Sequence, residues 1–498
     1  MPLVLALDLG STQLKVSLVA QNGTVVSSAI EGYETYAPHA QYLEQDPESW
    51  KRALKSALSR ALEAADPHDI ACVGFSGHMS GTVLLDEHGN VLYRCIMLSD
   101  SRSDYECHLI SELCGERIRA VTGNPVINAF TLPKLVWLKR NEPELWRKVR
   151  WIISPKDYIR YLLTGVITTE YTDAFNTLML DGNTRKWDDE IINAAGIDRS
   201  LLPEVLAPSD IIGRISDKAA SEYKLPACIP VVSGAADMAA AAVGMNLFNY
   251  GTDALTLGTC ATFLSFVPGI MSDGYGSITY HLHALPGSFY ALGSHFNGGL
   301  AVNWISRMLS SSGNLDYNEM DKLAEEAISV APGPDGVLAI PFLAGSGSPY
   351  FSSSDRFCLS GASAATGRGT LFKSMLEGIA MNLKQTLMLY DRMHNAEDRK
   401  VLLGGGGVKV AGWPEVIADV FQRDVLVVRN SDASTLGAAI IAGSSVGLFD
   451  DIASVSSKFI NLEREIKPDK SKGQLYAVLF EKFLKLYEAM RSVLIESS

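Results

Sequence analysis

One carboxylate of this chain stands between a short apolar strand and a helix, where it could act as a base. Asp237 closes the run Val231–Ala236 and opens the alanine-rich stretch Met238–Val243. A carboxylate in this place can accept the proton of a hydroxyl that attacks phosphorus. An aspartate at the start of a helix can equally accept a backbone N–H and cap the helix. These residues alone leave both roles open.

A second carboxylate is followed by small residues that suit a phosphate. Asp8 lies near the end of the apolar run Leu3–Leu9 and precedes the turn Gly10-Ser11-Thr12. The N–H groups of such a turn can point at a phosphate, while the carboxylate holds Mg²⁺ directly or through water. A plain hairpin with an Asx-type turn would look the same. Gly258-Thr259-Cys260 offers a second such turn, so the two could hold a polyphosphate from both sides.

The glycine run Gly404–Gly407 and His78 are compatible with ligand binding but do not identify the ligand. Gly404–Gly407 lies between the predicted strand Lys400–Leu403 and the predicted helix Trp413–Phe421, where it permits close approach of a nucleotide. A flexible connection would have the same composition. His78, in the segment Ser76–Gly81, could hydrogen-bond a sugar or lie in the core.

The motifs of several other enzyme classes are absent from the sequence. It contains no G-x-x-x-x-G-K-[ST], no G-x-G-x-x-G and no H-E-x-x-H. Gly443–Gly447 spells the G-x-S-x-G of hydrolases, but it follows the predicted helix Thr435–Ala442, whereas that motif follows a strand. We therefore treat this match as chance.

Composition limits the partners and the compartment. The chain has 498 residues, of which 20% are charged and 47% hydrophobic, enough for two to four domains with their own cores. Its net charge of -13 argues against nucleic acid or an anionic membrane as the main partner. Seven cysteines without a Cys-x-x-Cys pair indicate reduced thiols, and the N-terminus is typical of a strand, not of a signal peptide. These features predict a cytoplasmic protein without a membrane span.

The elements that must position these residues follow from the hydrophobic pattern. The N-terminus predicts a three-stranded meander, with strands over Leu3–Leu9, Lys15–Ala20 and Thr24–Ile30. Asp253–Leu257 and Ala261–Val267 repeat this strand, turn and strand plan, which indicates two halves that pack around a cleft. Helices are predicted from Asp46-Pro47-Glu48 onward, over most of residues 104–165, over Trp187–Ala195, and from Leu475 to Leu494.

Taken in order, these segments resemble the FGGY carbohydrate kinases, and among them the xylulokinase-like branch. The likeness runs from Leu5 to about Leu486, nearly the whole chain. Single motifs are weak evidence, but so many in one order are specific. From the N-terminus they are Asp8–Thr12, Gln45–Glu48 with Trp50, Gly74–Asp86, Thr122–Pro125, Phe130–Leu135, Pro155–Tyr158, Asp173-Ala174, Gly234–Asp237, Leu257–Thr259, Gly378–Ala380, Leu403–Gly407 and Leu436–Ala439.

The resemblance implies an α/β fold of two actin-like (ribonuclease H-like) ATPase domains that flank a catalytic cleft. Residues 1–247 would form the N-terminal domain, which binds the sugar and supplies the base, and residues 248–498 would form the nucleotide-binding domain. The implied activity is that of a carbohydrate kinase, which uses ATP and Mg²⁺ to transfer the γ-phosphoryl group to a hydroxyl of a small sugar. The family often forms dimers, so a homodimer is one expectation.

The functional residues of the family carry over to this sequence position by position. Asp237 would be the base that deprotonates the sugar hydroxyl, and Asp8 would support Mg²⁺. The ATP-binding residues would be Gly10, Ser11, Thr12, Lys15, Gly258, Thr259, Gly405, Gly406 and Gly407. The sugar-side residues would be His78, Met79, Ser80, Asp100 and Asp173.

The sequence departs from the xylulokinase pattern mostly in the sugar pocket. It has His78-Met79-Ser80 where xylulokinases carry Gln-Met-His, and Leu98-Ser99-Asp100 where they carry Trp-Asn-Asp. Met238 follows the base, where asparagine is common. Changed hydrogen-bonding groups alter which hydroxyl pattern a pocket accepts, because unpaired buried groups are costly. D-xylulose, a ketopentose, is therefore the default acceptor, with another pentulose, a polyol or an aldonate (a sugar acid) as alternatives.

Two other classes of function stay open. A catalytically silent relative could bind sugar or nucleotide as a sensor, although the retention of Asp8, Asp237 and Gly258-Thr259 argues against it. Another actin-like ATPase, such as a chaperone or a filament protein, would act without any sugar, and the sugar-side motifs argue against it. The predicted partners are thus small molecules, ATP and a sugar or polyol, and neither nucleic acid nor a membrane.

Overall fold

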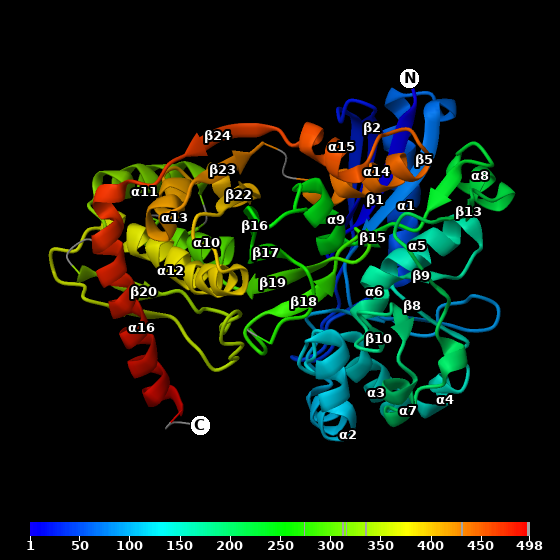
Figure 1. The fold of residues 1–498 in the computed structure, drawn as a ribbon, viewed down its shortest axis with the longest axis horizontal. Coiled ribbons are helices and arrows are strands. Elements are labelled where there is room, and N and C mark those ends of the chain that lie inside the picture. Colours follow the sequence, from blue (N-terminus) through cyan, green and yellow to red (C-terminus); the bar gives the residue numbers. More distant parts are fainter. Residues whose placement is uncertain (273, 311–312, 315, 334–335, 430–431, 496–498) are drawn as a thin grey trace.

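The protein, here a computed structural model, contains two seven-stranded sheets that lie on opposite sides of Figure 1. The structure describes residues 1–272, 274–310, 313–314, 316–333, 336–429 and 432–495. The first sheet has the order β13-β14-β5-β1-β2-β3, with β15 paired to β5. The second has the order β18-β19-β17-β16-β22-β23-β24.

Each sheet is built from one half of the chain. The strands of the first sheet are β1 (Leu3–Leu9), β2 (Gln13–Ala20), β3 (Val25–Gly32), β5 (Ile70–Gly77), β13 (Ile211–Arg214), β14 (Pro230–Val232) and β15 (Ala235–Ala236). Those of the second sheet are β16 (Thr252–Leu257), β17 (Ala261–Val267), β18 (Thr279–Leu282), β19 (Phe289–His295), β22 (Lys400–Gly404), β23 (Val425–Val428) and β24 (Leu462–Ile466). The N-terminal meander and its repeat near residue 250 are therefore confirmed.

The side chains of strand β1 alternate between the two faces of the first sheet. It pairs in parallel with β5 and antiparallel with β2. Its four leucines pack in one core, whereas Val4 and Ala6 pack in another. Because side chains alternate along a strand, Asp8 belongs to the face of Val4 and Ala6.

Helices cover both faces of the first sheet. The leucine face is covered by α1 (Pro47–Ala61), α5 (Pro155–Thr164) and α8 (Asp217–Tyr223). The opposite face is covered by α9 (Asp237–Gly244) and α14 (Ala433–Ser445). Helix α1 begins where the sequence predicts, because the side chain of Asp46 accepts the N–H of Glu48.

Helix α14 packs on the first sheet although it comes from the second half of the chain (Figure 1). A Cβ atom on its Gly437 would lie 1.8 Å from the carbonyl oxygen of Ala240 in α9. A Cβ atom on Gly74 of β5 would lie 2.5 Å from the carbonyl oxygen of Ala438. Glycines at these two positions therefore permit a backbone approach that any larger residue would prevent. The chain passes to the second sheet after α9, returns after β23, and passes over again after α15 (Ile452–Phe459).

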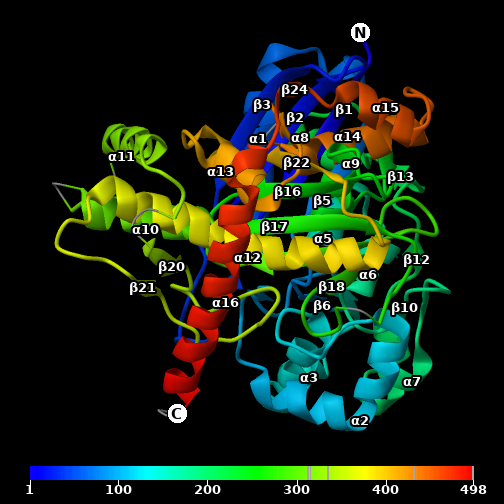
Figure 2. The ribbon, with the colours of Figure 1, turned by 60° about the vertical axis from the view of Figure 1, so that its left-hand side comes forward.

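The second sheet shares a large core with helices of the second half. These helices are α10 (Gly299–Leu309), α11 (Tyr317–Ser329), α12 (Arg368–His394), α13 (Trp413–Phe421) and α16 (Gly473–Ile495). Helix α12 runs along the sheet and α16 crosses in front of it (Figure 2). The predictions of α13 and of the long last helix are confirmed.

Short elements between β5 and β13 enclose a separate core. Its helices are α2 (Asp104–Thr122), α3 (Thr131–Asn141), α4 (Pro143–Trp146) and α7 (Asp189–Ala194), whereas α6 (Tyr171–Phe175) packs in the core of the second sheet. The remaining short strands are β4 (Glu44–Gln45), β6 (Val83–Leu85), β7 (Cys95–Ile96), β8 (Trp151–Ile153), β9 (Thr169–Glu170), β10 (Leu180–Asp181), β11 (Lys186–Trp187), β12 (Val205–Leu206), β20 (Leu338–Ile340) and β21 (Cys358–Ser360).

One predicted helix begins later than the sequence indicates. We predicted a helix from Trp187, but Trp187 ends β11 and α7 begins at Asp189. The reason is that Asp188 accepts the N–H of Ile191 at 3.0 Å and so caps the helix at that point. Among the described residues, no helix combines the length and the apolar character that crossing a membrane requires.

Candidate active site

Three neighbouring strands of the first sheet end at one edge, and each leads to a predicted site residue. Asp8 of β1 lies opposite Ser76 of β5 in a parallel pairing. Strand β15 pairs in parallel with the last residues of β5, directly before Asp237. His78 and Met79 follow β5 itself. The sheet therefore brings Asp8, Asp237 and this short segment together, as parallel strands do with residues at their carboxyl ends.

Asp237 is the first residue of α9 and is half-buried. The N-cap residue of this helix is Ala236, whose side chain cannot accept a hydrogen bond. Asp237 Oδ1 instead accepts the N–H of Met238 at 2.8 Å. Burial, and then the charge of Asp8, raises the pKa of Asp237 to about 7, against the opposing effect of N–H groups that include that of Met79. A carboxylate with this pKa can exchange a proton near neutral pH, as a general base must.

Asp8 faces the first turn of α14. The hydroxyls of Ser434 and Thr435 donate to Asp8 Oδ2 at 2.6 Å and 3.2 Å. Lys15 lies opposite Asp8 in β2 and pairs with Asp432, just before the helix. The sequence analysis did not identify Ser434 or Thr435 as site residues. The only indication of them in the sequence was the motif Leu436–Ala439, which follows directly.

Asp8 and Asp237 are chemically suited to Mg²⁺. The charge of Asp8 raises the pKa of Asp237, so a cation near both carboxylates would relieve their repulsion. Over the part of the chain that the structure describes, no group of three or more His, Cys, Asp or Glu side chains could hold a metal ion. Mg²⁺ fits this arrangement, because it commonly takes one or two carboxylates and completes its shell with water and substrate phosphates.

The predicted nucleotide residues of the second half lie together. Strands β16 and β22 are parallel neighbours, so Gly258-Thr259 and Gly405–Gly407 leave the same edge of the sheet. A Cβ atom on Gly405 would lie 2.5 Å from the carbonyl oxygen of Leu257, directly before the first of these turns. The N–H of Gly299, at the start of α10, donates to the carbonyl oxygen of Gly258 at 2.8 Å. Open α/β sheets bind their ligands at this edge.

The predicted phosphate turn of the first half is a tight hairpin. The N–H of Gly10 donates to the carbonyl oxygen of Gln13 at 3.0 Å. Ser11 and Thr12 are exposed at its tip, and Gln45 Nε2 donates to the carbonyl oxygen of Ser11 at 2.6 Å. Gly258 and Thr259 are exposed as well. The turns of both halves are thus accessible to a ligand.

Of the predicted sugar-side residues, His78 and Met79 are buried, and the N–H of Met79 contacts Asp237. The His78 ring packs edge-to-face on Trp50, with 5.6 Å between ring centroids, and neither of its nitrogens has a hydrogen-bond partner among the described atoms. Burial, and then the charge of Lys134, lowers the pKa of His78 to about 3, so the ring is neutral at physiological pH.

Ser80 and Asp173 lie below the surface and line a cavity of about 20 Å³, room for about one water molecule. Ser154 Oγ donates to Asp173 Oδ2 at 2.9 Å, whereas Asp173 Oδ1 is buried and has no hydrogen-bond partner in the described structure. The carbonyl oxygen of Ser80 accepts from Lys134 Nζ at 3.3 Å. The sequence placed both residues on the sugar side, and the structure shows neither side chain at an open surface.

Asp100 belongs to a different group of contacts. The guanidinium of Arg102 donates to both of its oxygens at 2.7–3.0 Å, and the N–H of Leu43 donates at 2.6 Å. Arg102 also pairs with Glu44 at 2.8 Å and lies over the ring of Tyr42. None of the contacts recorded for Asp100 within the described residues involves another predicted site residue.

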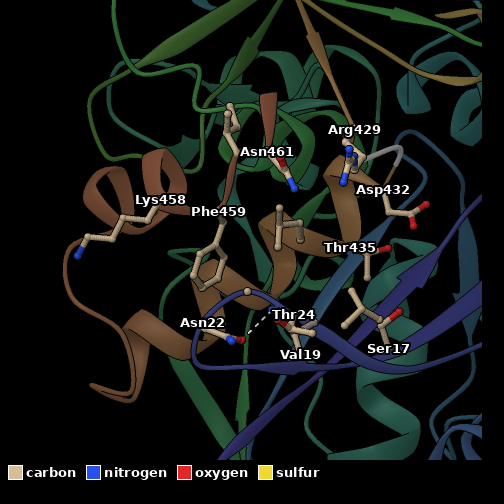
Figure 3. Close-up of a pocket in the computed structure, with 14 residues that line it drawn as sticks. Ser17, Val19, Asn22, Thr24, Arg429, Asp432, Thr435, Lys458, Phe459 and Asn461 are labelled. Atoms are coloured by element: carbon tan, nitrogen blue, oxygen red, sulfur yellow. Dashed lines mark hydrogen bonds between the residues drawn. The ribbon is translucent and has the colours of Figure 1, made fainter. Parts of the chain in front are cut away.

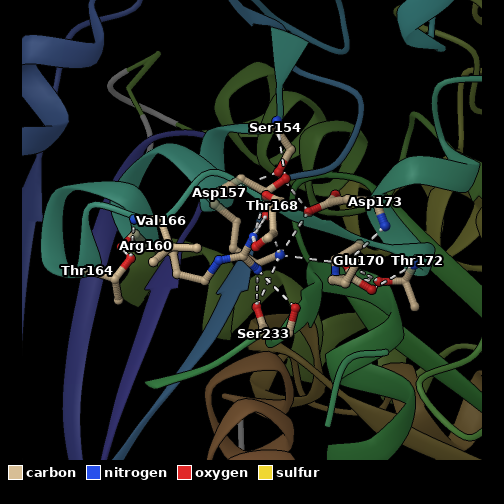
Figure 4. Close-up of polar contacts among 12 residues, drawn as sticks. Ser154, Asp157, Arg160, Thr164, Val166, Thr168, Glu170, Thr172, Asp173 and Ser233 are labelled. Atoms are coloured by element: carbon tan, nitrogen blue, oxygen red, sulfur yellow. Dashed lines mark hydrogen bonds and ion pairs between the residues drawn. The ribbon is translucent and has the colours of Figure 1, made fainter. Parts of the chain in front are cut away.

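A buried ionic cluster, which sequence reasoning did not find, includes Asp173 (Figure 4). Lys156 Nζ lies 3.0 Å from Asp157, 3.3 Å from Asp173 and 3.6 Å from Glu170. Arg160 lies 3.0 Å from Asp157. Burial raises the pKa of Asp173 to about 8, so this carboxyl keeps its proton at neutral pH. Burial raises the pKa of Glu170 as well, whereas the charges of Lys156 and Arg160 lower the pKa of Asp157 against the effect of its burial.

A groove of about 650 Å³ borders these residues at one end, where it is lined by Asp432, which pairs with Lys15, and by Thr435, which donates to Asp8 (Figure 3). It is lined by the β2–β3 turn at Asn22 and by Arg429 and Asn461, which lie where the chain passes between the sheets. Asn22 and the Gly10–Thr12 turn lie at opposite ends of β2. The eight residues of this strand separate them by about 25 Å. None of the site residues predicted from the sequence lines this groove, but through Asp432 and Thr435 it reaches the contacts of Lys15 and Asp8.

Comparison with known proteins identifies relatives over the whole chain. The N-terminal domain of the FGGY family of carbohydrate kinases matches residues 3–244, and the C-terminal domain matches residues 247–446. A xylulose kinase of Lactococcus lactis is 32% identical over 491 residues, 98% of this chain and 97% of its own. A gluconokinase of Bacillus subtilis is 27% identical over 490 residues, 97% of this chain and 95% of its own. The crystal structure of a xylulose kinase from Rhodospirillum rubrum, 27% identical, matches with a TM-score of 0.90 over 99% of both chains. The prediction of two actin-like domains is therefore confirmed.

Proposed function

This chain belongs to the FGGY family of carbohydrate kinases, and we propose that its acceptor is D-xylulose. The reaction class follows from the family: the γ-phosphoryl group of ATP passes to an alcohol group of a small sugar. The choice of acceptor is supported by the relatives named xylulose kinase, which align with nearly the whole chain.

The environment of Asp237 carries the mechanistic part of the proposal. Asp237 is half-buried, and burial together with the charge of Asp8 brings its pKa to about 7. A sugar hydroxyl within hydrogen-bond distance would give its proton to this carboxylate while the hydroxyl oxygen bonds to the γ-phosphorus and the bond to ADP breaks. The proton would then leave Asp237 after the product departs.

The two exposed turns are proposed to bind ATP. Gly10–Thr12 with Lys15 and Gly258-Thr259 would contact the phosphates, and Gly405–Gly407 would lie under the adenosine. Asp8 would hold Mg²⁺ directly or through water, and bound Mg²⁺ would neutralise charge on the phosphates. In this proposal residues 1–247 supply the base and the sugar site, and residues 248–498 supply the nucleotide site.

Other acceptors stay in the proposal as alternatives, because the sugar side differs from that of xylulokinases. A neutral His78 and the small Ser80 stand where xylulokinases carry glutamine and histidine. One relative over 97% of the chain is a gluconokinase. A pocket with changed hydrogen-bonding groups can favour another pentulose, a polyol or an aldonate.

The test is ADP release from Mg²⁺–ATP with the purified protein and a panel of pentuloses, hexuloses, polyols and aldonates. D-xylulose is expected to stimulate turnover most. Asp237→Asn is expected to lower kcat by about 100-fold or more, within the range of general-base contributions. Asp450→Asn, a change at an exposed aspartate, should leave kcat unchanged.

Three outcomes would revise the proposal. Greater stimulation by an aldonate or a polyol would replace D-xylulose as the acceptor. Binding of ATP and sugar without turnover anywhere on the panel would favour a sensor. Full activity of Asp237→Asn on a true substrate would remove Asp237 as the base.

A further inference from the structure

The residue before the proposed base is held by a side chain from a distant segment. The N–H of Ala236, one residue before Asp237, donates to Thr172 Oγ1 at 2.9 Å. Thr172 lies in the short helix α6 and is buried, so no bulk water competes for this contact. The peptide that leads into Asp237 is thus attached to α6 as well as to β5.

The direction of this hydrogen bond is determined by Glu170. Thr172 Oγ1 donates its hydrogen to Glu170 Oε1 at 2.7 Å, and the N–H of Thr172 donates to Glu170 Oε2 at 2.7 Å. A hydroxyl has one hydrogen to donate, so Thr172 meets Ala236 only as an acceptor. Glu170 therefore orients the hydroxyl for the N–H that it receives.

The ionic cluster in turn holds Glu170 and the start of the same segment. Glu170 is fully buried, and Lys156 lies 3.6 Å from its carboxylate. Arg160 Nη1 donates to the carbonyl oxygen and the hydroxyl of Ser233 at 2.7 Å and 3.0 Å. The segment 233–236 is therefore held at Ser233 by Arg160 and at Ala236 by Thr172, and both of these side chains are buried and paired.

We propose that Thr172 is a positioning residue for phosphoryl transfer: its hydroxyl, oriented by Glu170, holds the Ala236 peptide so that the Asp237 carboxylate faces the acceptor. The inference rests on the proposed role of Asp237 as the base. A base acts only within hydrogen-bond distance of the proton it takes, and misplacement by about 1 Å can cost about 100-fold in rate.

Three variants separate positioning from folding. Thr172→Val keeps the shape of the side chain and removes the hydroxyl, whereas Thr172→Ser keeps the hydroxyl. Thr122→Val is the matched control, because the buried Thr122 hydroxyl, like that of Thr172, donates one hydrogen bond and accepts one from a backbone N–H. It donates to the carbonyl oxygen of Ile118 at 2.7 Å and accepts from the N–H of Asn124 at 3.1 Å.

Thr172→Val is expected to lower kcat by about 10-fold to 100-fold while KM for ATP changes less than about twofold. Thr172→Ser should keep at least about half of the kcat, and Thr122→Val should keep all of it, although both valine variants lose thermal stability. Equal kcat values for the two valine variants, or a serine variant as slow as Thr172→Val, would overturn the proposal.

Hydrogen–deuterium exchange supplies a readout that needs no turnover. A peptide that covers residues 233–240 should exchange faster in Thr172→Val than in the wild type, and at the wild-type rate in Thr172→Ser. Unchanged exchange in Thr172→Val would show that the hydroxyl does not hold the segment.

Asp237→Asn, measured beside these variants, distinguishes the two proposals. Full activity of Asp237→Asn would remove the base, and with it the reason for positioning it. Loss of activity in Asp237→Asn together with normal kcat in Thr172→Val would leave the base in place and refute the role of Thr172 alone.

Discussion

Replacing Asp237 with asparagine is expected to stabilise the protein at alkaline pH and much less at acid pH. The pKa of this carboxyl is 3.8 in its ordinary state and about 7 in the folded protein, because of burial and then the charge of Asp8. Below pH 3.8 the carboxyl is neutral in both states and costs nothing. As the pH rises toward 7, the unfolded chain ionises while the folded protein keeps its proton, so stability is lost, and the full loss is present above pH 7.

The size of the effect follows from the rise in pKa. A rise from 3.8 to about 7 corresponds to an upper limit of about 4 kcal/mol above pH 7, at about 1.4 kcal/mol per pKa unit. The part that develops between pH 5 and pH 8 is about 3 kcal/mol. Asparagine can still accept the N–H of Met238 but does not titrate, so its stability lacks this pH dependence.

The assay is differential scanning calorimetry of the protein without nucleotide, sugar or divalent cation. For a domain of about 250 residues, 1 kcal/mol shifts Tm by about 2–4 °C. The Tm of Asp237→Asn minus that of the wild type should therefore increase by roughly 6–12 °C from pH 5 to pH 8. Asp450→Asn, at an exposed position, should show no such increase. A Tm difference that is the same at both pH values would refute the argument that burial and Asp8 raise the pKa of Asp237.

The remaining predictions concern packing, the ionic cluster and the reaction. Gly437→Ala should destabilise the protein by about 1–3 kcal/mol, because its Cβ would lie 1.8 Å from the carbonyl oxygen of Ala240. The control Gly115→Ala should be neutral or stabilising, because its Cβ would meet only Ser111, at 3.6 Å. Equal Tm values for the two variants would contradict this prediction. Lys156→Met should cost about 3–5 kcal/mol, because it leaves the buried Asp157 carboxylate without one of its two cations. The loss of Tm should be smaller at pH 5, where buried carboxyl groups that have lost Lys156 take up protons more readily, and an unchanged Tm at pH 8 would count against this ion pair. In the wild type, kcat/KM should fall tenfold per pH unit below about pH 7, since the base must be ionised, and a rate that stays flat down to pH 5.5 would contradict the assignment of Asp237.

Local sequence determined most of the secondary structure of this protein. The N-terminal meander of β1, β2 and β3 and the helix start at Asp46 follow from neighbouring residues alone, because alternation, turn residues and caps act over a few positions. The order of motifs also sufficed to indicate the family, and the family indicated two domains. The start of α7 was misjudged, because a cap at Asp188 outweighs the apolar pattern that begins at Trp187.

Only the tertiary structure decided the surroundings of the predicted site residues. The partners of Asp8 come from Ser434 and Thr435, more than 400 positions away, and nothing in either local sequence indicates the pairing. Asp173 and Asp100 have sequence positions that suit a sugar, yet the folded chain gives them buried partners. Local pattern encodes which face of a strand or helix is apolar, whereas contacts between distant segments depend on how those faces pack. The pKa of a carboxyl is set by the charges and the burial that such packing creates, so the chemistry of Asp237 is a property of the assembled fold.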